Sequence, residues 1–385
     1  MKKILIISDF NVNENSFISH LRLYDFAEYL SRENKVTLFL PFGENEVSFS
    51  NSNFTLIEGD AIKLEKAYKT SDALIVNGSV FEKFDFIKLN KPVIYDGYDP
   101  FSFEEMNKDA IKKIVTKSDY FLCASERQKN YWIGMLSVYN RVNPIIYRED
   151  NKLKNIIDVV GIKYSTSNSL VKNIEDFVLC ELDEDTDIEL IIDCFKDLKD
   201  IDLKIIYKDN RNLHKKYGEL FNGVNENIFL IRYIDENIRN EYISKAKIIL
   251  NICKDTLSSR FKPKDNLADY LRNKKLIISS SFSFLPDDLE SKKGIIMDGE
   301  NLKKIIYELM NDDDLCKEYL NNLDAFISDQ EDYLKRLKDI VNNLKIASDK
   351  NYLSNKSITA KKDVKSNIVF LKDMIQKGIK MVLRD

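Results

Sequence analysis

Short apolar runs rich in β-branched residues alternate with amphipathic stretches along the first part of the chain. Each run predicts a strand, and the amphipathic stretch 19–31 predicts a helix. The predicted strands are Lys3–Ile7, Lys35–Leu40, Ala73–Val76, Pro92–Tyr95 and Tyr120–Ala124. Because strands that alternate with helices form βαβ units, the pattern predicts a parallel sheet.

The predicted helix 19–31 carries an apolar stripe suited to packing on that sheet. The stripe consists of Leu21, Phe26, Ala27 and Leu30. On this assignment Arg22 belongs to a different surface of the helix.

The alternation of strands and helices restarts after residue 175. Strands are predicted at Asp176–Cys180, Leu203–Tyr207, Ile228–Leu230, Ile248–Asn251 and Lys275–Ser279, and a helix at Asp187–Leu198. The polar, turn-favouring segment 160–173 between the two sets fits an interdomain linker. We therefore expect one domain at 1–165, a second at 166–330, and a helical extension at 331–385.

The extension is expected to contain a connector and a separate helix. Segment 346–367 is rich in Lys, Ser and Asn and low in hydrophobicity, which indicates a mobile connector. Segment 368–385 has apolar residues at helical spacing and lysines on its other surface. Such a helix packs on the body of the protein or on a partner, or lies on an anionic membrane surface.

Length and composition fit a protein with two cores. The chain has 385 residues, and single cores stop growing at roughly 250–300 residues. With 59 Lys and Arg against 63 Asp and Glu, the net charge is -4, so no global positive field favours nucleic acid. The apolar run at the amino terminus is too short for a signal peptide, and no run is long enough to span a membrane. These features lead us to expect a cytoplasmic protein.

Cysteine and histidine usage argues against disulfide and metal sites. The five cysteines are widely spaced and contain no CxxC pair, and the chain has only two histidines. We therefore expect the cysteines to be small buried residues and expect no bound metal.

Several motifs follow one another in the first domain in a recognisable order. They are Tyr95–Phe101 with Glu104, Asp119–Gln128 with Tyr131–Gly134, Arg141–Pro144, and Asp158–Val160. The second domain continues this order of motifs with Ser259–Phe261, Lys264 and Leu267–Leu271. Together, over roughly residues 1–300, these segments resemble a branch of glycosyltransferase family 4 that is associated with bacterial surface glycans.

The resemblance implies a GT-B fold, in which two Rossmann-like parallel-sheet domains face a cleft and helices follow at the carboxyl terminus. It also implies transfer of a sugar, with retention, from a nucleotide-sugar donor to a surface glycan, a lipid-linked acceptor or a protein. No cofactor is required, because basic side chains and helix termini can neutralise the departing diphosphate. Such an enzyme works in the cytoplasm or peripherally at the inner face of the membrane, and a partner transferase is compatible with it.

The donor-binding candidates lie in the second domain. By resemblance, Asp269 would accept hydrogen bonds from the ribose hydroxyls, since a carboxylate can grip a vicinal diol. Arg260 and Lys264 would neutralise the diphosphate. For each of the three, the alternative is a solvated surface residue.

The remaining candidates lie in the first domain, at predicted strand ends or at the start of the first helix. The catalytic candidates are His20, Asp99 and Glu126. The candidates for acceptor or sugar binding are Arg22, Asp96, Glu104, Ser125 and Arg127. Structural alternatives stay open, because a lone His is often structural and Glu126 could cap a helix or pair with Arg127.

The sequence also departs from the family pattern. The first βα loop, 9–15, has no glycine, and segment 181–185 has four carboxylates that would repel a diphosphate. Ser258 stands where the family usually has a glutamate, and Asn266 stands where a basic residue is expected. The departures favour an alternative function, a catalytically degenerate subunit that binds an acceptor or an active partner transferase. A sugar-phosphate epimerase on the same scaffold also stays open.

Overall fold

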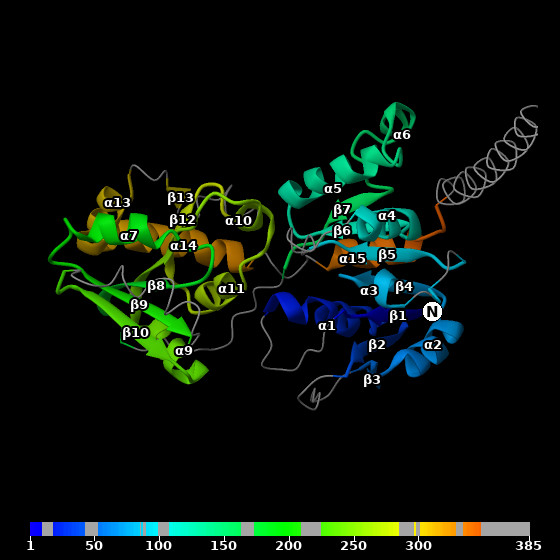
Figure 1. Cartoon of the computed structure of the whole chain (residues 1–385), viewed down its shortest axis with the longest axis horizontal. Coiled ribbons are helices and arrows are strands. Elements are labelled where there is room, and N and C mark those ends of the chain that lie inside the picture. Colours follow the sequence, from blue (N-terminus) through cyan, green and yellow to red (C-terminus); the bar gives the residue numbers. More distant parts are fainter. Residues whose placement is uncertain are drawn as a thin grey trace, which may run out of the picture.

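The computed structural model contains two α/β units joined through residues 160–173 (Figure 1). It describes residues 1–9, 18–42, 53–84, 86–87, 90–98, 108–162, 173–208, 225–284, 296–297, 301–328 and 334–347. Each unit is built on one parallel sheet, and every strand pair within the two sheets is parallel.

The first unit contains a seven-stranded sheet in the order β3-β2-β1-β4-β5-β6-β7. Its strands are β1 (Lys3–Ile7), β2 (Lys35–Pro41), β3 (Thr55–Gly59), β4 (Ala73–Asn77), β5 (Val93–Asp96), β6 (Tyr120–Cys123) and β7 (Ile157–Val159). Its helices are α1 (Ile18–Leu30), α2 (Ala61–Thr70), α3 (Val80–Lys83), α4 (Lys108–Lys117), α5 (Glu126–Val138) and α6 (Pro144–Glu149). Every residue of β4, β5 and β6 is buried, as expected for parallel strands that helices cover on both faces.

The second unit contains a six-stranded sheet in the order β10-β9-β8-β11-β12-β13. Its strands are β8 (Glu175–Glu181), β9 (Asp202–Lys208), β10 (Ile228–Tyr233), β11 (Ala246–Asn251), β12 (Leu276–Ser280) and β13 (Ile296–Met297). Its helices are α7 (Ile188–Phe195), α9 (Glu236–Lys245), α10 (Leu257–Phe261), α11 (Asp265–Arg272), α13 (Leu302–Asn311) and α14 (Asp313–Ser328). The predicted repetition of a parallel α/β unit is thereby confirmed.

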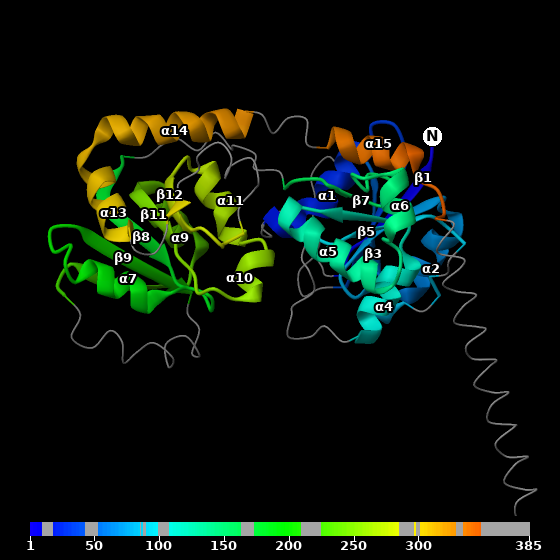
Figure 2. The same cartoon turned by 90° about the horizontal axis from the view of Figure 1, so that it is seen from above.

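The chain returns to the first unit after α14. Figure 2 shows α14 running along the second unit and α15 (Lys335–Asn343) lying on the first. Leu337, Ile340 and Val341 of α15 are buried in the same cluster as Ile4 and Phe26. Part of the predicted helical extension therefore completes the first hydrophobic core, whereas segment 348–385, which includes the predicted helix 368–385, lies outside the described residues.

Polar contacts fix α15 at both of its ends. Arg336 Nε lies 2.5 Å from the Asp158 carboxylate at the end of the sheet, and Lys338 Nζ lies 2.5 Å from Glu33. Near the other end of the helix, Lys2 Nζ donates to the carbonyl of Val341 at 2.6 Å. The residue before the first strand and the last described helix therefore hold each other in place.

Three short strands and one helix face differ from the sequence prediction. The two-residue strand β13, at the edge of the second sheet, was not predicted. Strands β3 and β7 lie at the two edges of the first sheet, and their few apolar residues predicted no strand. The assignment of Arg22 to a different surface of α1 is wrong. Arg22 is 2% exposed and lies on the buried face with Phe26, because Asp96 provides it with a buried charge partner.

The described cysteines agree with the expectation from their spacing. All five are free thiols; Cys123, Cys180, Cys253 and Cys316 are buried, and Cys194 is partly buried. Burial raises the pKa of the Cys180 thiol well above its ordinary value, so it packs as an apolar group.

We expect Leu337→Ala to lower the free energy of unfolding by about 2–5 kcal/mol, because it leaves a cavity where α15 meets the first sheet. Denaturant unfolding followed by circular dichroism measures the change. Asn342→Ala on the exposed side of α15 is the matched control and should change stability by less than about 0.5 kcal/mol. Equal effects of the two substitutions would show that α15 does not stabilise the first unit.

Lys275 gives the folded protein a distinct dependence on pH. Its ammonium group is buried and donates to the carbonyls of Ser244 at 2.7 Å and Ala246 at 3.0 Å, and burial lowers its pKa to about 8. The unfolded chain therefore binds more protons than the folded chain between this value and the ordinary pKa of 10.5. Relative to Lys275→Met, the wild-type protein should gain up to about 3 kcal/mol of stability from pH 7 to pH 10. Denaturant titrations across this range test it, and parallel pH curves for the two proteins would contradict it.

Candidate functional site

The strand orders of the two sheets point to the same kind of ligand site. In each sheet the direction of the strand order reverses once, between β1 and β4 in the first and between β8 and β11 in the second. Open α/β sheets bind ligands beyond the carboxyl ends of their strands at such points. The loops that follow β8 and β11 are therefore the places to look for a donor site.

The carboxyl ends of the two sheets meet at the start of α5. Arg127 Nη1 donates to the carbonyls of Phe282 at 2.6 Å and Ser283 at 3.1 Å, in the loop that follows β12. Gln128 Nε2 donates to the carbonyl of Phe261, at the end of α10, at 2.7 Å. The rings of Tyr131 and Phe261 lie 5.4 Å apart between their centroids. First-domain side chains on α5 thus hold the second domain through its backbone carbonyls.

Gln128 is central to this contact because each of its side-chain polar atoms is bonded. It is fully buried, its Oε1 accepts from the Ala124 amide at 2.7 Å, and its Nε2 also donates to the carbonyl of Tyr98. The Ser125 hydroxyl caps α5 by accepting from the Gln128 amide at 3.2 Å. The end of β6, the loop after β5 and the second domain are joined by this side chain.

Backbone pairing joins the loops after β8 and β11 in the second domain. The Lys254 amide donates to the carbonyl of Asp185 at 2.8 Å, and the Asp187 amide donates to the carbonyl of Ile252 at 3.1 Å. Thr186 and Cys253 form an isolated antiparallel bridge between these bonds. The two sides of the switch point are therefore fixed relative to each other.

Each carboxylate of segment 181–185 whose contacts are described has its own donors. Asp183 lies 2.9 Å from Lys264 Nζ and also accepts from the Thr186 hydroxyl at 2.7 Å. Asp185 accepts from the hydroxyls of Thr256 at 3.3 Å and Ser258 at 3.2 Å. The repulsion expected from the sequence is reduced, because internal donors bind these charges.

The pKa values of the Asp183–Lys264 pair follow from this geometry. Burial disfavours the charge on both groups, but their attraction outweighs it. The pairing therefore lowers the pKa of the Asp183 carboxyl and raises the pKa of the Lys264 ammonium. Both groups are charged at neutral pH.

A second ion network lies below this pair at the end of β8. Glu181 is 9% exposed and accepts from the hydroxyls of Tyr233 at 2.9 Å and Tyr270 at 3.1 Å. Arg239 on α9 lies 2.7 Å from both Glu181 and Asp269. Burial, with the Glu181 charge nearby, raises the pKa of Tyr270, so its hydroxyl stays protonated and donates.

The network gives Asp269 a different environment from the one that the sequence suggested. Its carboxylate is 20% exposed and is held by Arg239, with Arg272 Nη1 at 3.5 Å on its other oxygen. The alternative of a solvated surface residue is therefore wrong for Asp269. Its contact with a ribose stays a prediction. Arg239 was not among the residues predicted from the sequence, although its spacing from the buried Ile243, one turn on, indicates that it faces the core.

Arg260 and Lys264 have different surroundings. Arg260 is about half exposed and forms a two-pronged pair with Asp255, at 2.5 and 2.6 Å. Lys264 has a side chain that is 12% exposed and is turned towards Asp183. Lys254, in the loop after β11, is partly buried and takes part in no ion pair among the residues that the structure describes.

Two first-domain candidates are paired with each other. Arg22 Nε lies 2.9 Å from the Asp96 carboxylate, and both side chains are at most 1% exposed. Arg22 also donates to the carbonyl of Gly161. Burial raises the pKa of Asp96 in spite of the arginine beside it. The pair joins α1, β5 and the start of the linker, and sugar binding by either residue stays a prediction.

The other first-domain candidates divide into those that are described and those that are not. Glu126 is in the first turn of α5, is more than half exposed and lies 3.4 Å from Lys129. The suggestion that Glu126 caps the helix is wrong, because Ser125 is the capping residue. His20 lies in the first turn of α1, but its side chain is outside the described part. Asp99 and Glu104 fall outside the described residues.

Other features of the described residues do not add a site here. A hollow of about 600 Å³ is lined by Lys3, Lys35 and Ser71, at the amino ends of strands in the first sheet, which is the opposite edge from the switch points. Among the described ranges, no three His, Cys, Asp or Glu side chains form a group that could hold a metal ion. Within the same ranges no helix is both long and apolar enough to cross a bilayer.

Comparison with solved structures identifies the fold. TarM aligns with 14% identity over 73% of this chain and 57% of its own, at a TM-score of 0.51, so the chain spans little more than half of that protein's length. A mutant of TarM from S. aureus, in complex with fondaparinux, alpha-GlcNAc-glycerol and UDP, aligns with 10% identity over 89% of this chain and all of its own, at 0.58. A mutant O-GlcNAc transferase from Thermobaculum terrenum aligns with 11% identity over 93% and 69%, at 0.57. No family model and no curated protein matches the sequence.

These similarities and the two parallel sheets confirm the predicted GT-B fold. At such identities they establish the architecture, and the chemistry depends on the residues described above.

We expect Asp269→Ala to lower the free energy of unfolding by about 2 kcal/mol, because Arg239 loses a charged hydrogen-bond partner in a buried network. Asp269→Asn keeps an acceptor and should recover part of the loss. Asp324→Ala is the control, since it removes an exposed pair with Lys274 and should cost less than about 1 kcal/mol. Chemical denaturation of the three variants measures these changes, and an unchanged stability of Asp269→Ala would mean that Arg239 does not depend on this carboxylate.

Proposed function

We propose that the chain is a glycosyltransferase that takes a sugar from a nucleotide-sugar donor at the carboxyl edge of the second sheet. The observation that carries the proposal is the meeting of the two carboxyl edges at α5. There Arg127 binds the carbonyls of the loop after β12, and the α10 segment with Arg260 lies beside it. Donor and acceptor residues of a GT-B transferase have to be brought together across such a contact.

The donor side supplies the charge that the reaction needs. Departure of a nucleoside diphosphate places negative charge on the leaving group, which fixed cations stabilise more in the transition state than in the ground state. Lys264 and Arg260, beside the switch point, are proposed to fill this role, and Asp269 is the proposed ribose contact. The chemistry calls for no metal or other cofactor.

The acceptor side is proposed to be the first domain. Ser125, Glu126 and Arg127 lie at the end of β6, and His20 lies at the start of α1. Arg22 and Asp96 shape this side through their buried pair. The residues at the end of β6 and at the start of α1, with Asp99 and Glu104, are proposed to face the sugar and acceptor.

The proposal also covers the class of acceptor and the stereochemical outcome at the anomeric carbon. The solved TarM mutant that resembles this chain is in complex with alpha-GlcNAc-glycerol and UDP. By analogy we propose transfer with retention to a bacterial surface glycan, a lipid-linked acceptor or a protein. The same proposal includes domain limits at 165 and 330 and peripheral membrane contact through 368–385. It also includes a partner transferase and action at the inner face of the membrane.

One observation favours a second candidate function. Arg239, Arg260 and Lys264 all have internal carboxylate partners. A donor domain whose cations are already neutralised is what a degenerate subunit would have, with acceptor or partner binding as its remaining activity.

A thermal-shift screen against UDP, GDP, CMP, dTDP and their common sugars separates the two functions. We expect one nucleotide class to raise the melting temperature, because a ligand at about 100 times its Kd stabilises the folded state by about 2.7 kcal/mol. Lys264→Ala should reduce that shift. If none of the nucleotides raises the melting temperature, the degenerate subunit becomes the better account.

A further inference from the structure

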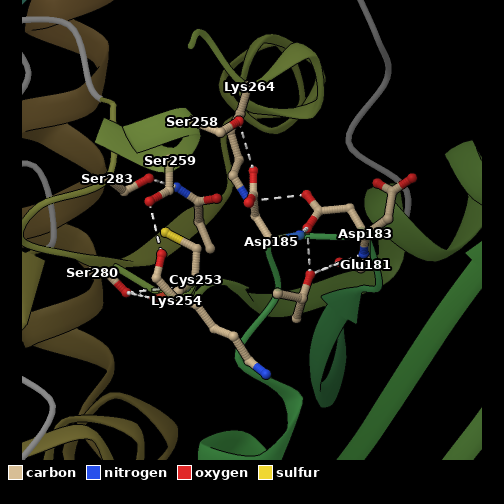
Figure 3. A network of polar contacts seen from close by, with 12 residues as sticks. Glu181, Asp183, Asp185, Cys253, Lys254, Ser258, Ser259, Lys264, Ser280 and Ser283 are labelled. Atoms are coloured by element: carbon tan, nitrogen blue, oxygen red, sulfur yellow. Dashed lines mark hydrogen bonds and ion pairs between the residues drawn. The ribbon is translucent and has the colours of Figure 1, made fainter. Parts of the chain in front are cut away.

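The groups that would bind a phosphate in the second domain are occupied by the protein's own carboxylates. Figure 3 shows Asp183 and Asp185 of the β8–α7 loop turned towards Lys264 and Ser258. The distances are 2.9 Å from Lys264 Nζ to Asp183, 3.3 Å from the Thr256 hydroxyl to Asp185, and 3.2 Å from the Ser258 hydroxyl to Asp185.

The chemistry of the three donors suits an anion with several oxygens. An ammonium group and two hydroxyls are among the usual donors to phosphate oxygens. They come from α10, its cap and the start of α11, which follow β11 on one side of the switch point. The carboxylates come from the loop after β8, on the other side. The contact therefore spans the place where the strand order puts a nucleotide.

We propose that Asp183 and Asp185 hold Lys264, Thr256 and Ser258 in the unliganded protein, and that the donor's diphosphate replaces them on these groups. The inference rests on the proposed function and adds two binding residues, Thr256 and Ser258, and a regulatory contact. The β8–α7 loop then acts as an internal competitor of the nucleoside diphosphate.

The surrounding structure allows the exchange without unfolding the loop. Asp183 is 37% exposed while Lys264 is 12% exposed, so the carboxylate lies on the solvent side of the pair. Backbone bonds hold the two ends of the loop independently of these side chains. The Leu182 amide donates to the carbonyl of Ile206 at 2.9 Å, and the Asp187 amide donates to the carbonyl of Ile252 at 3.1 Å. Rotation of the two carboxylate side chains exposes the ammonium group and the hydroxyls. For Asp183 this rotation also breaks the bonds that it accepts from the Asp185 amide at 3.0 Å and the Thr186 hydroxyl at 2.7 Å.

The electrostatics favour exchange by a diphosphate over exchange by a weaker anion. Leaving the largely buried Lys264 ammonium without a counter-charge is costly, so Asp183 departs only when another anion arrives. A nucleoside diphosphate brings more charge and more acceptor oxygens than the single carboxylate that it displaces. The loop thereby discriminates against anions that carry one charge.

Isothermal titration with UDP, GDP and dTDP tests the inference on the full chain. Asp183→Asn removes the competing charge while its side-chain oxygen can still accept from Thr186. The variant should therefore bind the preferred nucleotide about tenfold more tightly than the wild type. Asp185→Asn should tighten binding by about threefold, because it removes one of the two acceptor oxygens and so frees one hydroxyl but no cation. Glu184→Gln is the matched control, since it removes one exposed charge from the same loop between the two.

The outcomes separate this inference from the proposed function. Tighter binding by Asp183→Asn or Asp185→Asn than by Glu184→Gln supports it, and circular dichroism confirms that each variant is folded. If the wild type binds a nucleotide and neither Asn variant binds it more tightly than the control does, the inference is wrong. The proposed transferase function is not affected by that result. If neither the wild type nor any variant binds a nucleotide, both proposals fail together. Binding by the Asn variants alone supports the internal competitor and shows that the wild-type site is closed.

Discussion

Burial of the parallel strands on both faces determines where this protein can place polar chemistry. Strands β4, β5, β6 and β12 are buried along their whole length, so their side chains are committed to the cores. Only the residues at the strand ends and in the following loops can combine a fixed position with access to a ligand. Among the described candidates, Asp96 ends β5 and Ser125 lies in the loop after β6, while Glu126 and Arg127 follow in the first turn of α5.

The same burial explains how the charges at these ends are arranged. Glu181 and Asp96 are the last residues of β8 and β5, and both lie too deep for water to solvate their carboxylates. Each is paired with an arginine from a neighbouring helix, Arg239 or Arg22, because an unpaired buried charge would cost several kcal/mol. The buried pairs fix the strand ends, and the more exposed Asp183–Lys264 pair above them can exchange partners.

Periodicity predicted the architecture because it reflects local hydrogen bonding and side-chain direction. The runs at Lys3–Ile7 and Leu203–Tyr207 lie within strands of the two parallel sheets. The short edge strands β3 and β7 were missed, since few of their residues need to be apolar. The return of α15 to the first core was missed as well. It depends on contacts such as Lys2 with Val341, which are far apart in sequence and leave no local pattern.

The roles of the candidate residues were harder to predict. The sequence shows the same charged residue whether its side chain faces solvent or a buried partner. Arg22 and Arg239 each lie one turn before a buried apolar residue, Phe26 and Ile243, on the same helix face. That spacing marks a charge directed at the core, and a core charge requires a carboxylate at a neighbouring strand end. The rule locates both buried pairs. It leaves Arg127 unassigned, because Arg127 binds backbone carbonyls of the other domain, and no residue type in the sequence marks a carbonyl as an acceptor.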